Sequence, residues 1–333
     1  MTRRNLLKSV ACGFGSLALS GLQQVSAQSS NSLLAKPSLF PQRAKRVIFI
    51  FMAGGPSHVD TFDYKPELFS NDNKDIDFVG VRTNTFGKAS KRKLMKPLWD
   101  FQQHGQSGKY ISSLFPHIAR HVDDLAFVHS MHTEGVAHGP STLFMHTGAT
   151  NLVRPSMGSW ISYGLGTENS NLPAFVTISP SSSKGGPRNY GNAFLPAIHQ
   201  GTALGRAGNV NGAKIPNVEN AMLTDSQRKR RFGLLQKLNT IQSNAYSQDD
   251  KLEATIENYE LAWRMQMEAP ELTDFSKESN ATKTIYGIDE KHTDDFGKQC
   301  LLARRMVERG VRFVSVNYSD ESANPRWDQH GNM

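Results

Sequence analysis

The residues with the clearest chemical potential follow an apolar run near the start of the chain. Val47 to Met52 is uninterruptedly apolar and ends at two glycines and Pro56. Four polar side chains then come within seven positions: Ser57, His58, Asp60 and Asp63. Imidazole and carboxylate groups suit a divalent metal such as zinc. A tight turn with a solvated polar rim explains the same residues, so this segment alone leaves both interpretations open.

Further histidines and a carboxylate follow two other apolar runs. His129, His132 and His138 come at or after the run 125–131, and Asp328 and His330 come after the run 311–317. Parallel strands bring their carboxyl ends to one edge of a sheet, so the three groups are expected to converge there. Each histidine by itself is more typical of a surface residue. The three placements together favour a multi-metal site.

A pair of hydroxyl residues opens a predicted helix between these groups. Ser141 and Thr142 directly follow Pro140. The backbone N–H groups and the dipole at a helix start favour an anion, and they can help ionise a nucleophilic Ser or Thr beside a metal. Helix capping is the commoner role of such residues, and the local sequence alone favours the cap.

The elements that would position these residues alternate between strand and helix. Apolar runs predict strands at 47–52, 125–131, 173–178 and 311–317. Helical periodicity predicts helices at 112–122, 140–145, 157–164, 225–247, 250–267 and 294–309. Polar, Gly-rich or aperiodic stretches predict loops at 64–96, 101–108 and 179–214. A helix, Gly310 and a strand in that order are typical of a parallel sheet, so we expect an α/β fold.

The first 27 residues have the composition of a signal peptide. Arg3 and Arg4 precede a mildly apolar stretch that ends in Val25-Ser-Ala27, which predicts twin-arginine export to the periplasm or beyond. Cleavage would leave Cys300 as the single cysteine and lower the formal charge from +8 by three, to +5. That charge gives little support for nucleic-acid binding. The remaining chain has no apolar run long enough to span a bilayer.

Several motifs together resemble the secreted proteins of the domain-of-unknown-function 1501 family. They are Lys45-Arg-Val-Ile-Phe-Ile-Phe-Met-Ala-Gly-Gly-Pro-Ser-His-Val-Asp-Thr-Phe-Asp63, His138-Gly-Pro-Ser141, Met145-His-Thr-Gly148, Met157-Gly-Ser-Trp160, Asn189-Tyr-Gly-Asn-Ala-Phe-Leu-Pro196 and Trp327-Asp-Gln-His-Gly-Asn332. The family is usually placed with the alkaline phosphatase and sulfatase superfamily. The resemblance therefore implies an alkaline phosphatase-like domain over 28–333, with a mostly parallel central sheet, helices on both faces and a two-metal site.

The resemblance also implies roles for individual residues. Asp60 would be a metal ligand assisted by His58 or Asp63, and Asp328 and His330 would be the first pair of carboxyl-terminal ligands. Ser141 falls at the place of the nucleophile, with Thr142 in reserve, and His146 at the place of a histidine that follows the serine in related mutases. The Cys-x-Pro-x-Arg signature of arylsulfatases is absent from the sequence. The family continues with further motifs after Asn332, so the domain is expected to lack its C-terminal part, including another Asp-His pair.

Two functions follow as expectations. The first is an exported hydrolase of phosphate or sulfate esters, small or polysaccharide, which uses divalent zinc, calcium or magnesium and a serine nucleophile. The second is a non-catalytic protein or fragment of the same fold with a surface or carbohydrate-associated role.

Overall fold

The computed structural model describes residues 33–38, 40–77, 91–135, 137–169, 171–205, 224–245, 260–261, 263–264, 271–318 and 327–328. The predicted signal peptide, most of the predicted helix 250–267 and His330 lie outside these residues. Within this part of the chain, no helix is both long and apolar enough to span a membrane.

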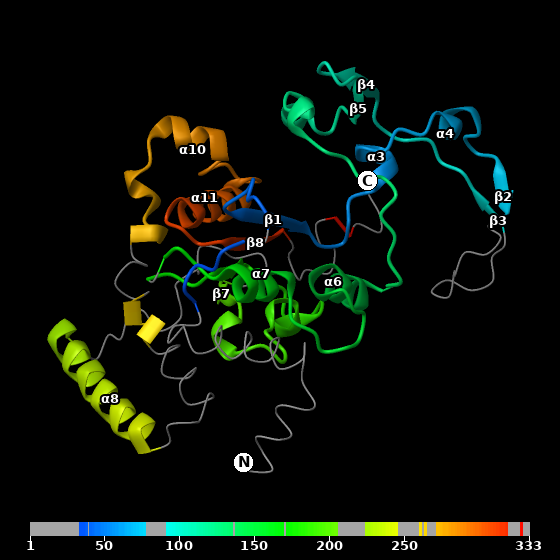
Figure 1. Ribbon diagram of the computed structural model, residues 1–333. Coiled ribbons are helices and arrows are strands. Elements are labelled where there is room, and N and C mark those ends of the chain that lie inside the picture. The colour runs from blue at the N-terminus through cyan, green and yellow to red at the C-terminus, as the bar shows by residue number, and fades with distance from the viewer. Residues whose placement is uncertain are drawn as a thin grey trace, which may run out of the picture.

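A four-stranded parallel sheet forms the centre of the protein (Figure 1). Its order is β1 (Val47–Met52), β8 (Phe313–Tyr318), β6 (Phe175–Ile178) and β7 (Thr202–Leu204). All three pairings are parallel, so the carboxyl ends of the strands share one edge. The α/β fold expected from the sequence is confirmed.

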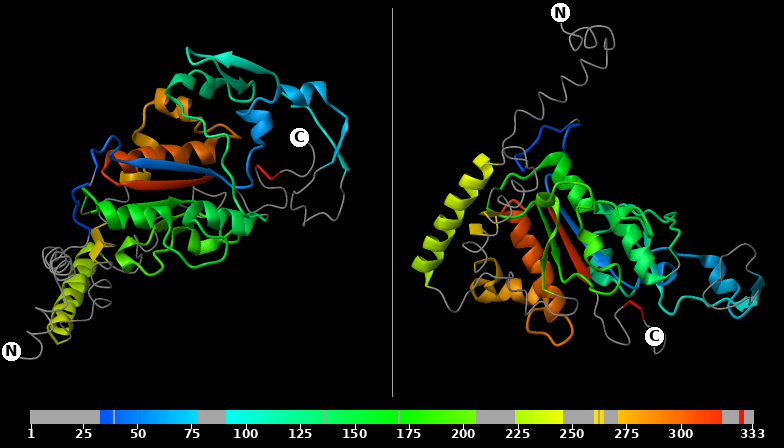
Figure 2. Two further views of the ribbon diagram at one scale, coloured as in Figure 1. Left: turned by 45° about the vertical axis from the view of Figure 1, so that its right-hand side comes forward. Right: turned by 90° about the horizontal axis from the view of Figure 1, so that it is seen from below.

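Helices cover both faces of this sheet (Figure 2). Helix α11 (Asp294–Glu308) lies on one face, and α6 (His138–Thr147) and α7 (Met157–Leu165) lie on the other. The alternation of a strand sends successive side chains to opposite faces. Because helices cover both faces of the sheet, side chains on both faces of β8 are shielded, and its first five residues are all buried.

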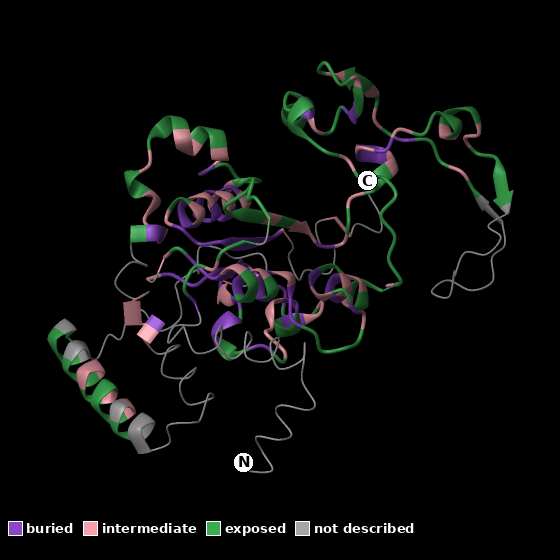
Figure 3. Ribbon diagram, in the orientation of Figure 1, coloured by how far each residue is buried: buried purple, intermediate pink, exposed green. Residues whose placement is uncertain are grey.

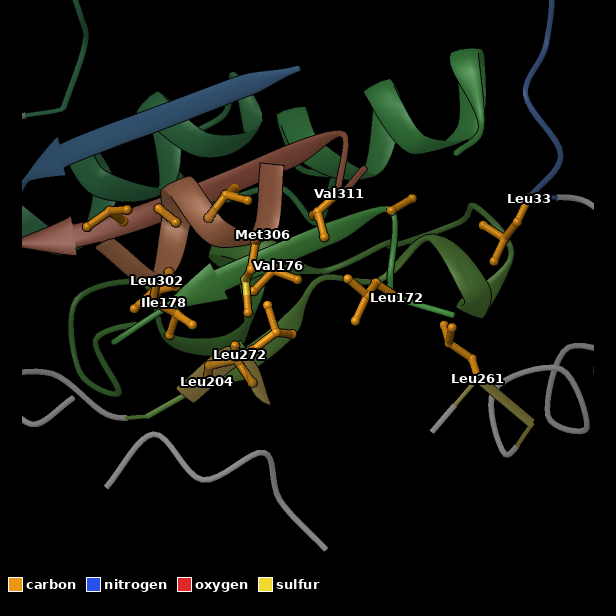
Figure 4. Packing of buried hydrophobic residues seen from close by; sticks show 14 of the residues in the cluster. Leu33, Leu172, Val176, Ile178, Leu204, Leu261, Leu272, Leu302, Met306 and Val311 are labelled. Carbon is orange, nitrogen blue, oxygen red and sulfur yellow. The ribbon is translucent and has the colours of Figure 1, made fainter. Parts of the chain in front are cut away.

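The main apolar core lies on the α11 face of the sheet (Figure 4). Val314 and Val316 of β8 pack there with Leu302 and Met306 of α11. Each fully buried aliphatic side chain of this kind stabilises the fold by roughly 1.5–3 kcal/mol relative to exposure. On the opposite face Phe313 contacts the ring of Phe175 edge-on, with 5.3 Å between centroids.

A buried arginine ties α11 to the preceding segment. Arg305 is 8% exposed and pairs with Glu278 at 2.7 Å, and it also donates to the carbonyl oxygens of Leu272 and Asp274, each at 2.9 Å. The segment includes a short 3-10 helix, Phe275–Lys277, and helix α10 (Asn280–Tyr286). Since one guanidinium satisfies a carboxylate and two carbonyls, this residue fixes the course of the chain before α10.

Residues 58–77 and 91–135 form an excursion beside the sheet, upper right in Figure 1. Its elements are α3 (His58–Thr61), α4 (Pro66–Ser70), the hairpin of β2 (Asp75–Asp77) and β3 (Lys91–Lys93), the hairpin of β4 (Phe101–His104) and β5 (Lys109–Ser112), α5 (Pro116–Ala119) and the 3-10 helix Val122–Asp124. A small second core of Ile111, Ala119 and Val122 holds it together.

The structure corrects several sequence predictions in the first half of the chain. The predicted loop 64–96 contains α4, β2 and β3, and the predicted helix 112–122 begins only at Pro116. The run 125–131 is not a strand: Val128 and Met131 are 65% and 71% exposed, and no strand of the described residues pairs with it. The predicted loop 101–108 is half of a hairpin, because Gly105 and Gly108, both at φ +62°, form its turn. Strand β1 is not buried on both faces, because it is the edge of the described sheet, and Ile50 is 48% exposed.

The second half of the chain follows the predictions more closely. Helices α7 and α11 and strands β6 and β8 fall within a few residues of their expected bounds. The predicted loop 179–214 contains β7 and the 3-10 helices Gly186–Tyr190 and Ala197–His199. Helix α8 (Asp225–Ala245) forms as predicted, but its apolar stripe is not core: Leu234, Leu238 and Ile241 are all more than half exposed (Figure 3).

Candidate functional site

The turn after β1 and the last described residues meet at the carboxyl edge of the sheet. Gly54 has φ +105°, and a Cβ on it would lie 2.6 Å from the carbonyl oxygen of Trp327 and 2.8 Å from the Cβ of Asp328. Only glycine fits both the backbone conformation and this close approach. The first and last motifs, 274 positions apart, are therefore in contact, as their placement after parallel strands predicted.

Asp328 is the centre of a charged cluster at this edge. Its carboxylate accepts from His138 Nε2 at 2.9 Å and from Lys184 Nζ at 3.5 Å. The Asp328 and Lys184 side chains are only 14% and 16% exposed, whereas His138 is 44% exposed. Such half-buried charge-assisted hydrogen bonds fix the orientation of the imidazole. The cluster joins the start of α6, the loop after β6 and the segment that follows β8.

Lys184 was missed by the sequence reasoning. It follows a serine run after β6, where Ser181 Oγ accepts from the backbone N–H groups of Ser183 and Lys184 at 3.3 and 3.0 Å. This turn holds the lysine close to the sheet edge. A lysine in a Ser- and Gly-rich loop directly after a buried strand was the signal in the sequence that could have found it.

Ser141 lies one helical turn after His138 on α6. Residues three positions apart on a helix are neighbours, with about 5–6 Å between their Cβ atoms. Ser141 is half-buried, and a Cβ on Gly135 would overlap its Oγ, so the serine packs closely against the loop before the helix. The expected capping role is wrong, because Ala137 is the N-cap and the N–H of Ser141 already bonds to its carbonyl. Thr142, the reserve, is buried.

His146 lies in an apolar environment against β1. Its ring meets those of Phe49 and Phe51 edge-on, with centroids 5.7 and 4.9 Å apart, and its Nε2 has no hydrogen-bond partner among the described residues. Burial lowers the pKa of His146 to about 4, so the imidazole is neutral at pH 7. Five positions after Ser141, it projects about 140° away around the helix axis.

Of the three residues after β1 that were expected to bind metal, Asp60 and Asp63 have separate partners and His58 is exposed to solvent. Asp60 Oδ1 accepts from the backbone N–H of Leu98 at 3.3 Å, which anchors the excursion. Asp63 Oδ1 accepts from Lys65 Nζ at 2.9 Å and His129 Nδ1 at 3.0 Å. Burial raises the pKa of Asp63, but the hydrogen bonds from Lys65 and His129 outweigh it, so the pKa lies below its usual value. His58 is exposed at the start of α3.

The described residues do not by themselves form a metal site. Among them, no three His, Cys, Asp or Glu side chains lie close enough together to hold an ion. Asp328 with His138 and Asp63 with His129 each offer two such groups. The expected partner of Asp328, His330, lies outside the described residues. A typical protein zinc site has three or four protein ligands.

The fold and this cluster define an α/β protein with a polar site at the carboxyl edge of a parallel sheet, where such folds place ligands. Residues 44–333 match the family described as "Protein of unknown function (DUF1501)", and the chain belongs to that family. No curated protein sequence matches the chain, and no solved structure does.

Proposed function

We propose that the chain is an exported hydrolase of phosphate or sulfate esters with an alkaline phosphatase-like fold and Ser141 as its nucleophile. One observation carries this proposal: Asp328, His138 and Lys184 gather at the carboxyl edge of the sheet, one helical turn from Ser141. The cluster combines a histidine oriented by a carboxylate, a hydroxyl and a cation. A serine nucleophile can use such a histidine as its base and such a cation to stabilise the anionic group in transfer.

The first half of the reaction transfers the phosphoryl or sulfuryl group to the serine. Ser141 Oγ forms a bond to phosphorus or sulfur while its proton passes to His138. The ester bond breaks, its electron pair stays on the leaving oxygen, and that oxygen takes the proton from His138. Asp328 holds the imidazole and stabilises its protonated form. The Lys184 ammonium, beside the same carboxylate, offers positive charge to the anionic group in transfer.

The second half of the reaction releases the group to water. His138, neutral again, takes a proton from a water molecule whose oxygen attacks the phosphorus or sulfur atom. The bond to Ser141 Oγ breaks and the serine recovers its proton from His138. No new residue is needed, because the same histidine acts as base and then as acid in each half.

A divalent ion, zinc, calcium or magnesium, belongs to the proposal on sequence grounds, with Asp60, Asp328 and His330 as its ligands and His58 or Asp63 assisting. Because the described residues do not assemble such a set, no bond or proton in the steps above passes through a metal. Metal dependence is therefore an arm of the test.

The test measures turnover of p-nitrophenyl phosphate and p-nitrophenyl sulfate by the purified protein, with a chelator and with each of the three ions added. Ser141→Ala is expected to reduce turnover to background. Ser113→Ala, an exposed serine on the excursion, is the matched control and should keep full activity. Turnover that survives Ser141→Ala refutes the nucleophile. Absence of turnover on both esters in every condition refutes the enzyme and leaves the non-catalytic alternative.

Two histidine variants decide which imidazole serves Ser141. The sequence motif points to His146, whereas the structural cluster points to His138. A lost general base typically costs about 10²–10⁴-fold in rate. We expect that loss in His138→Ala and not in His146→Leu. The reverse result would return the role to His146.

The twin-arginine export that we propose has a separate test. A variant carrying Arg3→Lys and Arg4→Lys should remain in the cytoplasm on cell fractionation, whereas the unaltered chain should be exported. Equal export of both would refute this route.

A further inference from the structure

A pocket lies in the excursion, between the residues that follow α3 and the β4–β5 hairpin, and its lining does not include Ser141, His138, Lys184 or Asp328. Its volume is about 180 Å³, and it opens to solvent on one side. An engineered apolar cavity of about 150 Å³ in another protein holds one benzene molecule. The pocket is therefore of the size of one six-membered ring.

Aromatic rings form much of the pocket wall. Tyr64 and Tyr110 stack with ring centroids 4.4 Å apart and an angle of 25° between their planes. The ring centroids of Phe62 and Phe127 lie 5.7 Å apart. The negative face of an aromatic ring attracts the weakly positive C–H bonds of a saturated ring. Four aromatic side chains around one ring-sized space thus favour a ring-shaped ligand with C–H faces.

Polar groups complete the pocket and are of mixed type. Asp63 Oδ1 is held by Lys65 and His129, while its Oδ2 has no partner among the described residues. The same bond occupies Nδ1 of His129 and leaves Nε2 for other contacts. Lys109 makes no ion pair with a described carboxylate. The pocket thus presents acceptors and donors together, which matches hydroxyl groups, because each hydroxyl both donates and accepts.

The net charge of the groups around the pocket favours a negatively charged ligand. Lys65 offsets the carboxylate of Asp63, and Lys109 then supplies one further positive charge beside the pocket. A purely aromatic acid carries no hydroxyl group to donate to the carboxylate of Asp63. We propose that this pocket binds one pyranose ring of an acidic carbohydrate, with the aromatic rings against its C–H faces and Asp63, His129 and Lys109 on its substituents. Asp63 is also offered above as an assisting metal ligand, but here Lys65 and His129 hold it at the pocket, and the proposal does not depend on ester hydrolysis at Ser141.

The test uses the full chain and three probes: D-glucuronate, D-glucose and benzoate. Saturation-transfer NMR detects binding, and chemical-shift titration gives the Kd of each. Both sugars are expected to bind, and glucuronate up to about fivefold more tightly, because an exposed ion pair with Lys109 is a weak interaction. Ser141→Ala should bind the sugars unchanged, which separates this pocket from the proposed ester site.

Variants locate the binding. Tyr110→Leu removes one stacked ring and should weaken both sugars by up to about tenfold. Lys109→Met should abolish the preference for glucuronate and leave the affinity for glucose unchanged. Matched controls are Tyr163→Leu and Lys93→Met, which alter an exposed tyrosine on α7 and an exposed lysine on β3 outside the pocket. Urea midpoints for each variant separate lost binding from lost folding; Lys109 is exposed, so its variant should fold normally.

Three results would overturn the proposal. The first is absence of binding by both sugars. The second is binding that neither Tyr110→Leu nor Lys109→Met alters. The third is benzoate binding more tightly than either sugar, with the same loss in Tyr110→Leu, which would assign the pocket to an aromatic ligand instead.

Discussion

Replacing Gly54 by alanine should separate backbone strain from the contact that holds Asp328 in place. The neighbouring glycine provides a matched control. Gly54 and Gly55 both have positive φ, at +105° and +82°, but a Cβ on Gly55 would meet nothing within 4 Å. A Cβ on Gly54 would overlap the backbone of Trp327 and the side chain of Asp328.

The expected free energies follow from these two environments. Both variants carry backbone strain of about 1–2 kcal/mol, since L-residues rarely adopt this conformation. Gly54→Ala adds an overlap that typically costs about 1–3 kcal/mol when the surroundings stay in place. If the Trp327 segment moves instead, the rings of Phe115 and Tyr318 lose their contacts with Trp327, at about 0.5–1.5 kcal/mol for each pair. Either route gives an extra loss of about 1–3 kcal/mol.

Two measurements distinguish the contributions. Urea unfolding gives the free energy of unfolding for each variant. Fluorine NMR of protein labelled with 5-fluorotryptophan gives one resonance for each of the four tryptophans, and Trp327→Phe assigns that of Trp327. The Trp327 resonance should move in Gly54→Ala and stay in Gly55→Ala. Equal unfolding free energies and an unmoved resonance in both variants would refute the contact.

Three further predictions concern stability. Gly158→Ala should lose about 1–3 kcal/mol, because its Cβ would lie 2.6 Å from the ring of Phe175, whereas Gly164→Ala on the same helix meets nothing within 4 Å and should gain up to about 1 kcal/mol; equal urea midpoints would contradict this. The folded-state pKa of His146 is lowered from 6.5 to about 4, so the unfolded chain takes up this proton at a higher pH than the folded protein. The free energy of unfolding should therefore be unaffected by His146 above pH 6.5 and fall by roughly 3 kcal/mol as the pH drops to 4. His146→Leu should flatten that part of the stability profile, and an unchanged slope would count against burial of the neutral imidazole. Arg305→Met should lose about 3–5 kcal/mol, because it removes the 2.7 Å ion pair with Glu278, which then keeps only Arg304 at 3.4 Å, and the hydrogen bonds to two carbonyls. Adding Glu278→Leu should recover part of this loss in thermal unfolding; no recovery would mean that the pair is not coupled.

The fold was predictable where a strand had both a clear apolar run and a place inside the sheet. β8 has both, and its predicted range and burial agree with the structure. The run 125–131 is similarly apolar but has no strand beside it among the described residues, so Leu125, Val128 and Met131 remain exposed and only Phe127 joins the small core. Sequence periodicity reports which side chains are apolar. It does not report whether a pairing partner exists, and β-strands need one.

The site was predictable at the level of its elements and less so for its side chains. The sequence placed Asp328 and the Gly54 turn at one edge of the sheet, and the structure joins them. Whether a carboxylate at this edge of the sheet binds a metal ion or pairs with a lysine depends on which loop reaches it. Lys184 comes from a Ser- and Gly-rich loop whose path no periodicity defines. Asp63 likewise pairs with His129, because the run before His129 does not join the sheet.

The contact between Gly54 and Asp328 has a consequence for the timing of folding. It joins positions 274 residues apart, and the pairing of β1 with β8 spans nearly as many. Closing a long loop costs little at equilibrium, about 0.6 kcal/mol for each doubling of its length, but contacts of this range form slowly. The edge that carries the cluster therefore assembles only after Asp328 has left the ribosome. Among the described strands only β8 pairs with β1, so β1 lacks this partner until residues 313–318 have been made.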